Sequence, residues 1–384
     1  MNPNAEFDIV VYGATGYTGR LVAEYLAGRY GVGGEVKWAM AGRSAAKLAE
    51  VRDLIGAPAQ TPLVVADADK PADLEAMVRR AKAIVTTVGP YQLYGDGLVA
   101  ACVAAGTDCL DLAGEPNWMR KVIDTHSEAA KTSGARIVHS CGFDSIPFEL
   151  GVFFAEETAK AKLGGYVPRV KGRIRGMRGG LSGGTAASGT ATMAAIQKDP
   201  SLMQLLMNPF ALTPGFEGPA QPPGNAVEHD DDLGADVGPF MMAAINSKNV
   251  HRSNALMGHP WGEGFKYDEM SVVAPGAPVA FDGTMGPGAP KPGEGPTREE
   301  REAGFYDIVF IGIADDGRKV QVSVKGDRDP GYGSTSKILA ETAICLVKDC
   351  AGVPGGVWVP GAAMGARLID RLEKNAGLSF TVEG

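Results

Sequence analysis

The sequence predicts an α/β protein: a Rossmann-type doubly wound parallel sheet with an inserted mixed α+β second domain. Three observations support this fold class. Residues 7–20 place a short apolar run before glycines spaced three apart. Short strands then alternate with helical patterns of about ten to fifteen residues as far as residue 147, as in parallel sheets. Beyond residue 147 the pattern changes to the alternation of half-exposed strands.

The stretch FDIVVYGATGYTGR, residues 7–20, has the pattern of a buried strand, a tight turn and the start of a helix. Gly13 allows the turn, Gly16 allows the backbone to approach a pyrophosphate, and Gly19 allows close packing of the helix. The spacing differs from the strict G-x-G-x-x-G fingerprint, so a glycine-rich turn without a ligand is the alternative. Three side chains of this turn are also expected to contact a cofactor: Thr15, Tyr17 and Thr18.

The residues after the second and third strands indicate which dinucleotide binds. The strand predicted at 36–42 is followed by Arg43 and Ser44. A site for NAD places an acidic residue here, whereas a cation and a hydroxyl suit the 2′-phosphate of NADP(H). Asp67 follows the strand at 62–66, where a group that contacts adenine is expected. The alternatives are a solvated arginine at Arg43 and a capped strand end at Asp67.

The remaining elements follow in order. Six strand–helix units predict that residues 1–147 form the dinucleotide-binding domain. Residues 148–330 are expected to form a substrate or dimerisation domain. Residues 331–384 are expected to form C-terminal helices that pack back on the dinucleotide-binding domain. A hairpin is predicted around Asp315, Asp316 and Gly317, and a long loop at 274–296. Expected helices lie at 18–29, 45–55, 71–80, 97–105, 118–131, 148–162, 335–348 and 361–374, and further strands at 83–88, 108–112, 136–140, 169–178, 306–314 and 318–325.

Composition excludes several functional classes. The 384 residues carry a net charge of -8, which argues against a nucleic-acid partner. Five cysteines without a C-x-x-C pair indicate reduced thiols and no structural metal. The first strand leaves no room for a signal peptide, and no apolar run has the length of a membrane span. A cytoplasmic protein is expected, with peripheral lipid or membrane contact and a homodimer left open.

The motifs together resemble one family. The chain is similar to the saccharopine dehydrogenase-like oxidoreductases, and most similar to the trans-acting enoyl reductases that act on polyketide-derived lipids. The resemblance implies a Rossmann domain, an inserted mixed domain and a C-terminal return, with NADP(H) as cofactor. The matching stretches, which span nearly the whole chain in one order, are 13–19, Ala41–Ser44, Val88–Tyr91, Cys141–Pro147, Ser182–Thr185 and Gly331–Lys337.

The nicotinamide of NADPH is expected at the loops after the fourth to sixth strands, where Gly89, Pro90 and Phe143 would contact it. Reduction of an enoyl thioester needs a hydride at the β-carbon, a donor to the carbonyl oxygen and a proton for the α-carbon. The catalytic candidates are Tyr91, Asp144 and Ser145. Alternatively, Tyr91 fills the domain interface, and Asp144 caps the following helix, which has Pro147 in its first turn.

Three functional hypotheses follow. The first is NADP-dependent reduction of a carbon–carbon double bond in an acyl or other hydrophobic substrate, for which residues 202–207 and Phe210 would line a tunnel or fill a core. The second, less favoured, is a saccharopine-type amino-acid or imine dehydrogenase, with Arg173, Arg175 and Arg178 available for substrate carboxylates. The third is a lipid-associated protein that binds NADP without catalysis. Carbonyl reduction by a Tyr-x-x-x-Lys pair is disfavoured, since no tyrosine has a lysine four residues later.

Overall fold

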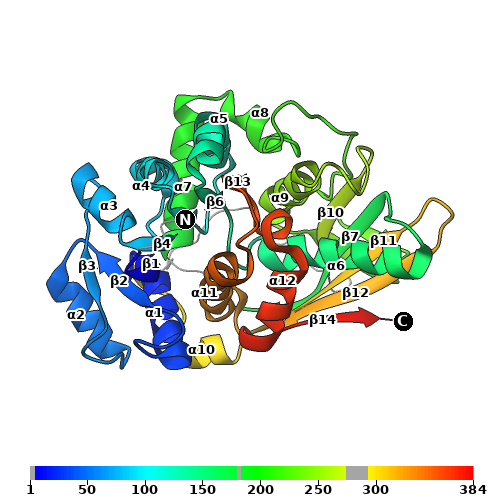
Figure 1. Ribbon diagram of the computed structural model, residues 1–384. Helices are drawn as coiled ribbons and strands as arrows, with labels where there is room; N and C mark the ends of the chain where they lie inside the picture. The colour runs from blue at the N-terminus through cyan, green and yellow to red at the C-terminus, as the bar shows by residue number, and fades with distance from the viewer. Residues whose placement is uncertain (1–4, 180–182, 274–292, 384) are drawn as a thin grey trace.

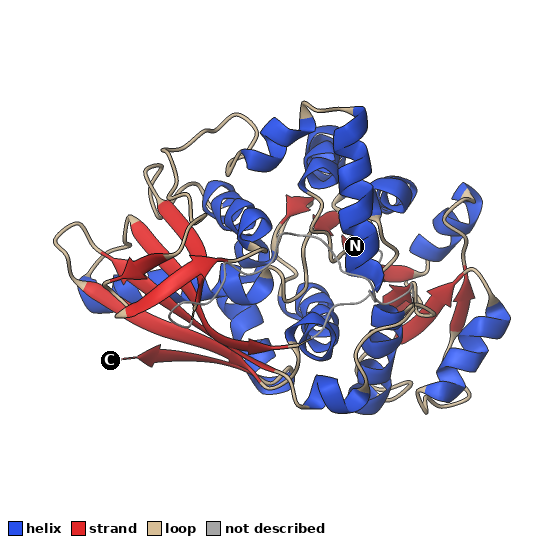
Figure 2. Cartoon of the chain, turned by 180° about the vertical axis from the view of Figure 1, so that it is seen from behind, coloured by secondary structure: helices blue, strands red, loops and turns tan. Residues whose placement is uncertain are grey.

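The computed structural model describes residues 5–179, 183–273 and 293–383. The chain forms two seven-stranded sheets, sheet A and sheet B, at opposite ends of an elongated molecule, with helices between and around them (Figure 1). Seen from behind, the strands of sheet B fan out beyond the helices that cover one of its faces (Figure 2). This two-sheet α/β architecture confirms the predicted fold class.

Sheet A is entirely parallel, in the order β13-β6-β5-β4-β1-β2-β3. Every residue of β1 is buried, as expected for the central strand of a sheet covered on both faces. The chain order reverses between β1 and β4, which is where open α/β sheets bind ligands. The strands are β1 Phe7–Tyr12, β2 Trp38–Gly42, β3 Leu63–Val65, β4 Ala81–Thr86, β5 Asp108–Leu110, β6 Arg136–Val138 and β13 Gly356–Trp358.

Helices cover both faces of sheet A. Alternate residues of β1 divide between two hydrophobic cores: Ile9 and Val11 face one, whereas Val10 and Tyr12 face the other. The first core is covered by α1 Tyr17–Tyr30, α2 Ala45–Leu54, α6 Ile146–Leu163, α11 Thr335–Ile344 and α12 Pro360–Asn375. The second is covered by α3 Pro71–Val78, α4 Tyr91–Ala105 and α5 Pro116–Ser133.

Sheet B is mixed, in the order β14-β12-β11-β7-β10-β9-β8, with β7 and β10 parallel and the other pairs antiparallel. Helix α6 packs so tightly on it that a Cβ built on Gly151 would lie 2.1 Å from the ring of Phe310. The strands are β7 Arg169–Arg178, β8 Glu228–Asp230, β9 Ala235–Pro239, β10 Lys266–Val272, β11 Phe305–Ile313, β12 Lys319–Gly326 and β14 Leu378–Glu383. The β11–β12 hairpin lies where the sequence predicts it.

The C-terminal segment differs from the expected pair of helices, because it also adds a strand to each sheet. Strand β13 pairs with β6 in sheet A, and β14 pairs with β12 in sheet B. A three-residue strand is too short to show alternation, which is why periodicity does not reveal β13. The remaining elements are α7 Gly183–Lys198, α8 Leu202–Met207, α9 Ala243–Leu256, α10 Arg298–Glu302 and the π-helical turns η1 Pro330–Ser334 and η2 Cys345–Asp349.

Two further observations concern the sequence-based exclusions. Within the described ranges, no helix combines the length and the apolar composition that crossing a membrane requires. All five cysteines are buried and carry free thiols.

A buried ion pair fastens three chain segments of sheet A together. The Asp108 carboxylate of β5 accepts hydrogen bonds from the backbone N–H and Nε of Arg136 in β6, at 3.1 and 3.0 Å. Nη1 of Arg136 donates to the carbonyl oxygen of Cys350, 2.8 Å away, in the segment that leads to β13. Both charged side chains are almost completely buried, so neither can turn to water if the other is lost.

We therefore expect Asp108→Asn to lower the free energy of unfolding by about 3–5 kcal/mol, because it leaves a buried guanidinium without its counter-charge. Denaturant titration followed by circular dichroism measures this loss. Asp124→Asn is the control: Asp124 pairs with Arg120 on the surface of α5, and its loss should cost less than about 1 kcal/mol. Equal effects of the two substitutions would contradict the importance of the buried pair.

Candidate functional site

The glycine-rich turn has the geometry that a dinucleotide requires. Gly13 adopts φ +93°, a conformation that L side chains rarely adopt. A Cβ built on Gly19 would lie 2.2 Å from the carbonyl oxygen of Gly13, so α1 can pack this closely on the turn only without a side chain there. Gly16 is the N-cap of α1 and supplies no side-chain cap. The N-terminus of α1 therefore keeps uncapped N–H groups for an anionic ligand.

Thr15 and Thr18, which are also predicted to contact the cofactor, lie at this turn, whereas the Tyr17 hydroxyl bonds elsewhere. Thr15 lies against β2, with its side chain 3.7 Å from a Cβ built on Gly42, and Thr18 is half-buried. The Tyr17 hydroxyl donates to the carbonyl oxygen of Pro296 and accepts from Nη1 of Arg301 at 3.0 Å. Its side chain therefore fastens α1 to the segment before α10, and the contact of Tyr17 with a cofactor stays a prediction.

Arg43, Ser44 and Asp67 meet at the carboxyl ends of β2 and β3. Arg43 is exposed, and Ser44 is the N-cap of α2, accepting from the backbone N–H of Lys47 at 3.3 Å. Asp67 and Arg43 both interact electrostatically with the hydroxyl of Tyr12, at the end of β1. Burial, together with Asp67, raises the pKa of Tyr12 to about 12, and Arg43 opposes this rise. The three predicted residues thus surround one corner of the sheet edge.

The loop after β4 is tied to its neighbours by Tyr91. The Tyr91 ring stacks on Trp118 with centroids 5.3 Å apart. Its hydroxyl donates to the carbonyl oxygen of Thr86 and accepts from the N–H of Leu112, both at 3.0 Å. Burial raises the pKa of Tyr91 well above its usual value. Both hydrogen-bonding positions are used within the protein, so the structure favours the alternative of a structural tyrosine over the predicted proton donor.

Glu115 positions the same loop from the end of β5. Its carboxylate accepts hydrogen bonds from the N–H groups of Tyr91 and Gln92, at 3.0 and 2.9 Å. A carboxylate at this place satisfies the first turn of α4 and favours its dipole, which explains why α4 begins at Tyr91 rather than at the predicted residue 97. Oγ of Ser188 in α7 donates to the same carboxylate at 2.9 Å. Gly89 lies beside this contact, since a Cβ built on Gly89 would be 3.9 Å from Oγ of Ser188.

A second buried carboxylate joins the ends of β5 and β6. Oδ1 of Asp111 accepts from the N–H groups of Ala113 and Ser140, at 2.9 and 3.0 Å, and Oδ2 lies 2.6 Å from Nδ1 of His139. Ser140 has φ +61°, unusual for a residue with a side chain, and these bonds hold it there. Asp111 therefore sets the course of the chain into the Cys141–Pro147 motif.

The three predicted residues of that motif have different environments. The Phe143 ring packs in the core against Tyr306, with centroids 4.7 Å apart, so only its backbone lies at the sheet edge. Ser145 is buried; its hydroxyl donates to the carbonyl oxygen of Asp144 at 2.6 Å and accepts from Nδ2 of Asn249 in α9 at 2.7 Å. Ser145 is also the N-cap of α6, without a side-chain cap bond, which corrects the alternative in which Asp144 caps this helix.

Asp144 is the exception among these loop carboxyls. Its side chain is exposed, and no hydrogen bond or ion pair to it is found within residues 5–179, 183–273 and 293–383. Desolvation by the surrounding loop nevertheless raises the pKa of this carboxyl to about 6. A carboxyl with a pKa near neutrality and no structural partner is suited to exchange protons.

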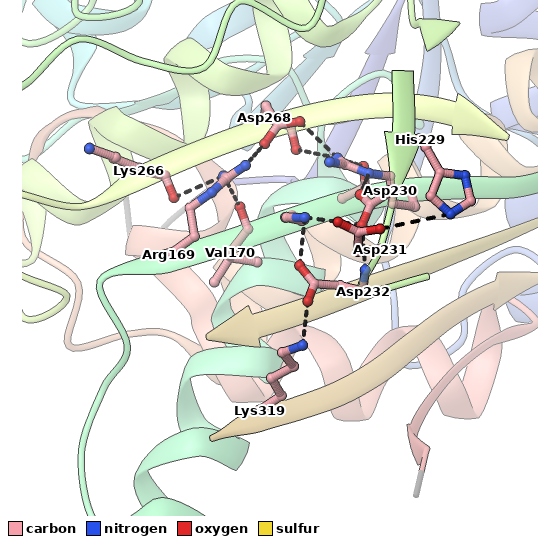
Figure 3. Close-up of polar contacts among 12 residues, drawn as sticks. Arg169, Val170, His229, Asp230, Asp231, Asp232, Lys266, Asp268 and Lys319 are labelled. Carbon is pink, nitrogen blue, oxygen red and sulfur yellow. Dashed lines mark hydrogen bonds and ion pairs between the residues drawn. The ribbon is translucent and has the colours of Figure 1, made fainter. Parts of the chain in front are cut away.

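Most basic residues of β7 are engaged with the acids of sheet B (Figure 3), whereas Arg178, the last residue of the strand, is exposed and forms no ion pair among the described residues. Arg173 is buried and bonds to Asp230 and Asp268, at 2.7 and 2.8 Å. Arg175 pairs with Asp307 and Glu383, at 2.7 and 2.6 Å. Because these guanidinium groups neutralise acids of their own domain, the structure does not support their predicted role toward substrate carboxylates. Further pairs of this network involve Arg169, Lys171, Asp232 and Lys319.

The remaining motifs are placed as follows. In the stretch Gly331–Lys337, Ser334 is the N-cap of α11, and the buried carboxylate of Asp329 accepts from the N–H groups of Tyr332 and Gly333, at 3.0 and 2.6 Å. Ser182 lies outside the described residues. The stripe at 202–207 forms α8, of which no residue is buried, and Phe210 packs against His251 in the interior. The stripe is therefore not a core segment.

Several site residues were not predicted from the sequence. Thr87 is adjacent to the glycine turn, where a Cβ built on Gly13 would lie 2.7 Å from its hydroxyl. Asn249 and Ser188 come from the second part of the chain, and nothing in their local sequence indicates that they approach this edge. Glu115, by contrast, lies in the loop after the fifth strand, which the sequence places near the nicotinamide; only its hydrogen bonds to the first turn of α4 are not predicted.

These observations define a class of protein first: an α/β oxidoreductase with a turn for an NADP-type dinucleotide at the switch point of its sheet. The residues fit the cofactor, since two glycines make the cradle, the N-terminus of α1 is uncapped and Arg43 is exposed at the ribose position.

Comparison with known proteins agrees with this class. Residues 9–138 match the family described as the saccharopine dehydrogenase NADP binding domain. The chain is 39% identical to a protein of Mycobacterium tuberculosis (strain ATCC 25618 / H37Rv) assigned provisionally as a trans-acting enoyl reductase, over 98% of this chain and 97% of the relative. It is 36% identical to the trans-acting enoyl reductase of Mycobacterium ulcerans (strain Agy99), over 96% of both. The apo, histidine-tagged saccharopine dehydrogenase (L-Glu forming) of Saccharomyces cerevisiae shares the fold, with a TM-score of 0.50, 10% identity and coverage of 98% of this chain and 100% of that one.

The chain therefore belongs to the saccharopine dehydrogenase-like oxidoreductases, in the group that contains the trans-acting enoyl reductases. Its dinucleotide-binding domain binds NADP(H).

We expect Arg43→Ala to weaken NADPH binding by about ten- to a hundredfold and to leave NADH binding unchanged, because hydrogen bonds to a charged group contribute about 1.5–3 kcal/mol. Fluorescence titration with each nucleotide measures both affinities. Arg79→Ala, at an exposed position on the far end of α3, controls for the loss of one positive charge. A parallel loss of NADPH and NADH affinity would show that Arg43 does not contact the 2′-phosphate.

Proposed function

We propose that this protein is an NADP-dependent reductase of a carbon–carbon double bond in an enoyl substrate, an acyl thioester or a similar hydrophobic molecule. The single observation that supports this most directly is the Asp144 carboxyl beside the expected nicotinamide position. No hydrogen bond or ion pair to it is found in the described part of the chain, and desolvation raises its pKa to about 6. NADPH supplies a hydride when bound. The residues of the chain then have to bind the acyl group, exclude water and deliver one proton.

The surroundings of Asp144 suit an uncharged, apolar substrate. Leu112 lies against the loop that carries Asp144, since a Cβ built on Gly142 would be 2.8 Å from its side chain, and it packs against both hydrophobic cores. Met242 also packs at the boundary of the two cores, and Phe240, two residues before it, packs on Phe148 of α6 with ring centroids 5.5 Å apart. An acyl chain can be desolvated at such a boundary. Protonated Asp144 can then donate to the α-carbon or to the carbonyl oxygen that gains negative charge.

A saccharopine-type amino-acid or imine dehydrogenase is the second candidate, favoured by the shared fold. Its substrate carries carboxylates that need several cationic partners. Of the three candidate arginines, Arg173 and Arg175 are already paired, and the exposed Arg178 is left as a single cation. A non-catalytic, lipid-associated NADP-binding protein is the third. We further propose a cytoplasmic location; peripheral lipid contact and a homodimer belong to the same hypothesis and need direct measurement.

A panel of substrates separates the candidates. Purified protein is incubated with NADPH and either an enoyl-coenzyme A thioester or 2-oxoglutarate with lysine, and oxidation of NADPH is followed by absorbance. Turnover with the enoyl thioester supports the proposal. Turnover only with the oxo acid and amine would replace it by the second candidate, and NADPH binding without any oxidation would replace it by the third.

We predict that Asp144→Asn lowers kcat by about a hundredfold or more, while NADPH affinity stays unchanged. The general acid must be protonated, so in the unmodified protein kcat should be highest below pH 6 and fall as pH rises through the folded-state pKa of about 6. Asp144→Asn should lose this decline. Asp316→Asn, at the exposed tip of the β11–β12 hairpin, is the matched control and should behave like the unmodified protein. An unchanged pH profile in Asp144→Asn would exclude Asp144 as the proton donor.

A further inference from the structure

Helix α9 is unusual because its polar side chains are buried on all sides. Seven of them are at most 4% exposed: Asn246, Lys248, Asn249, His251, Arg252, Ser253 and Asn254. Burying polar groups costs free energy unless each finds a partner. The partners of these side chains therefore show what the helix does.

Most of the buried polar groups of α9 hold loops or neighbouring helices. Lys248 donates to the carbonyl oxygens of Leu206 and Ala244, both at 2.8 Å. Arg252 donates to the carbonyl oxygens of Leu212 and Val357, at 2.5 and 2.6 Å. Ser253 donates to Glu149 of α6, and Asn254 bonds to the backbone of Trp261 and Gly262. These contacts explain the helix as a structural clamp.

The side chains of Asn249 and Asn246 instead contact the hydroxyl of Ser145. Nδ2 of Asn249 donates to it at 2.7 Å, and Oδ1 of Asn246 lies 3.5 Å from it. The hydroxyl in turn donates to the carbonyl oxygen of Asp144 at 2.6 Å. Nδ2 of Asn246 donates to Glu269 of β10 at 2.9 Å, and the Tyr267 hydroxyl donates to the same carboxyl at 2.7 Å. Sheet B is thereby connected, through α9, to the peptide that carries Asp144.

Two other contacts hold the same loop. The N–H of Phe143 donates to Oγ1 of Thr335 in α11 at 3.0 Å, and the N–H of Cys141 donates to the carbonyl oxygen of Asp111 at 2.7 Å. The backbone around Asp144 is thus bonded to α9 through Ser145, to α11 and to the loop after β5, whereas no bond to the Asp144 carboxyl itself is found among the described residues. Such a rigid backbone around a side chain without partners is what preorganisation of a reacting group requires.

We propose that Asn249 is a positioning residue, which fixes the peptide of Asp144 through the Ser145 hydroxyl and so holds the carboxyl at the acyl substrate. This rests on the proposed function, in which Asp144 delivers the proton. Oδ1 of Asn249 is buried without a hydrogen-bond partner in the described structure. The amide is therefore oriented by the hydrogen bond that its Nδ2 donates to Ser145. Asn249 links the half of the molecule that contains sheet B to the proton donor of the half that contains sheet A.

The test compares Asn249→Ala with Asn254→Ala, a substitution of the same residue type on the same helix. Within the described residues, the Asn254 side chain bonds to the 261–262 turn, so its loss should lower stability and leave the acid unaffected. We expect Asn249→Ala to lower kcat about tenfold, to leave NADPH affinity unchanged, and to shift the apparent pKa of Asp144 downward as the loop relaxes toward solvent. That pKa is read from ¹³C-aspartate NMR, with the Asp144 resonance assigned through Asp144→Asn.

A double-mutant cycle distinguishes positioning from a general loss of stability. If Asn249 acts through Ser145, adding Asn249→Ala to Ser145→Ala should cause no further change in the Asp144 pKa or in kcat. Additive effects, or identical pKa values in Asn249→Ala and Asn254→Ala, would overturn the inference. The NMR readout is independent of turnover: a shifted pKa in a protein that reduces no enoyl thioester would refute the proposed substrate and leave the positioning role intact.

Discussion

Buried carboxylates that accept hydrogen bonds from backbone N–H groups determine the shape of the candidate site. Glu115 satisfies the first turn of α4, and Asp111 satisfies the chain after β5 and after β6. Asp329 does the same for the turn before α11. Each of these carboxylates meets N–H groups that would otherwise be buried without partners, which is a large cost in a protein interior. The loops at the carboxyl edge of sheet A are therefore held in one conformation before any ligand binds.

This arrangement gives Asp144 its distinct chemistry. A carboxylate that accepts two N–H groups is stabilised in its charged form and is a poor acid near neutrality. Asp144 has no such donors among the described residues, while the surrounding protein desolvates it and raises its pKa to about 6. Asp144 thus differs from Glu115, Asp111 and Asp329 in having no hydrogen-bond partner among the described residues, which suits the proton donor that we propose.

Local patterns were sufficient to predict the dinucleotide half of the fold. The glycine spacing, the strand–helix alternation and the cation after β2 each depend on residues close in sequence, so their physical meaning can be read without the structure. The roles of Tyr91 and Asn249 depend instead on contacts between distant segments. Helix α9 could not be predicted from hydrophobic periodicity, because its polar residues are buried and it has no apolar stripe. Strand β13 is three residues long and is recognisable only by its pairing with β6.

The ion pairs of sheet B affect which substrates could bind between the part of the molecule that contains sheet A and the part that contains sheet B. A substrate with several carboxylates would need cations that have no internal partner, and in sheet B the buried Arg173 is held between Asp230 and Asp268. Breaking such pairs to bind substrate would leave buried acids uncompensated, at a cost of several kcal/mol. An enoyl thioester makes no such demand, since it needs apolar surface for its chain and one proton donor. The pairing of Arg173 therefore supports the neutral acyl substrate that we propose over an amino acid with several carboxylates, even though the fold is shared with saccharopine dehydrogenase.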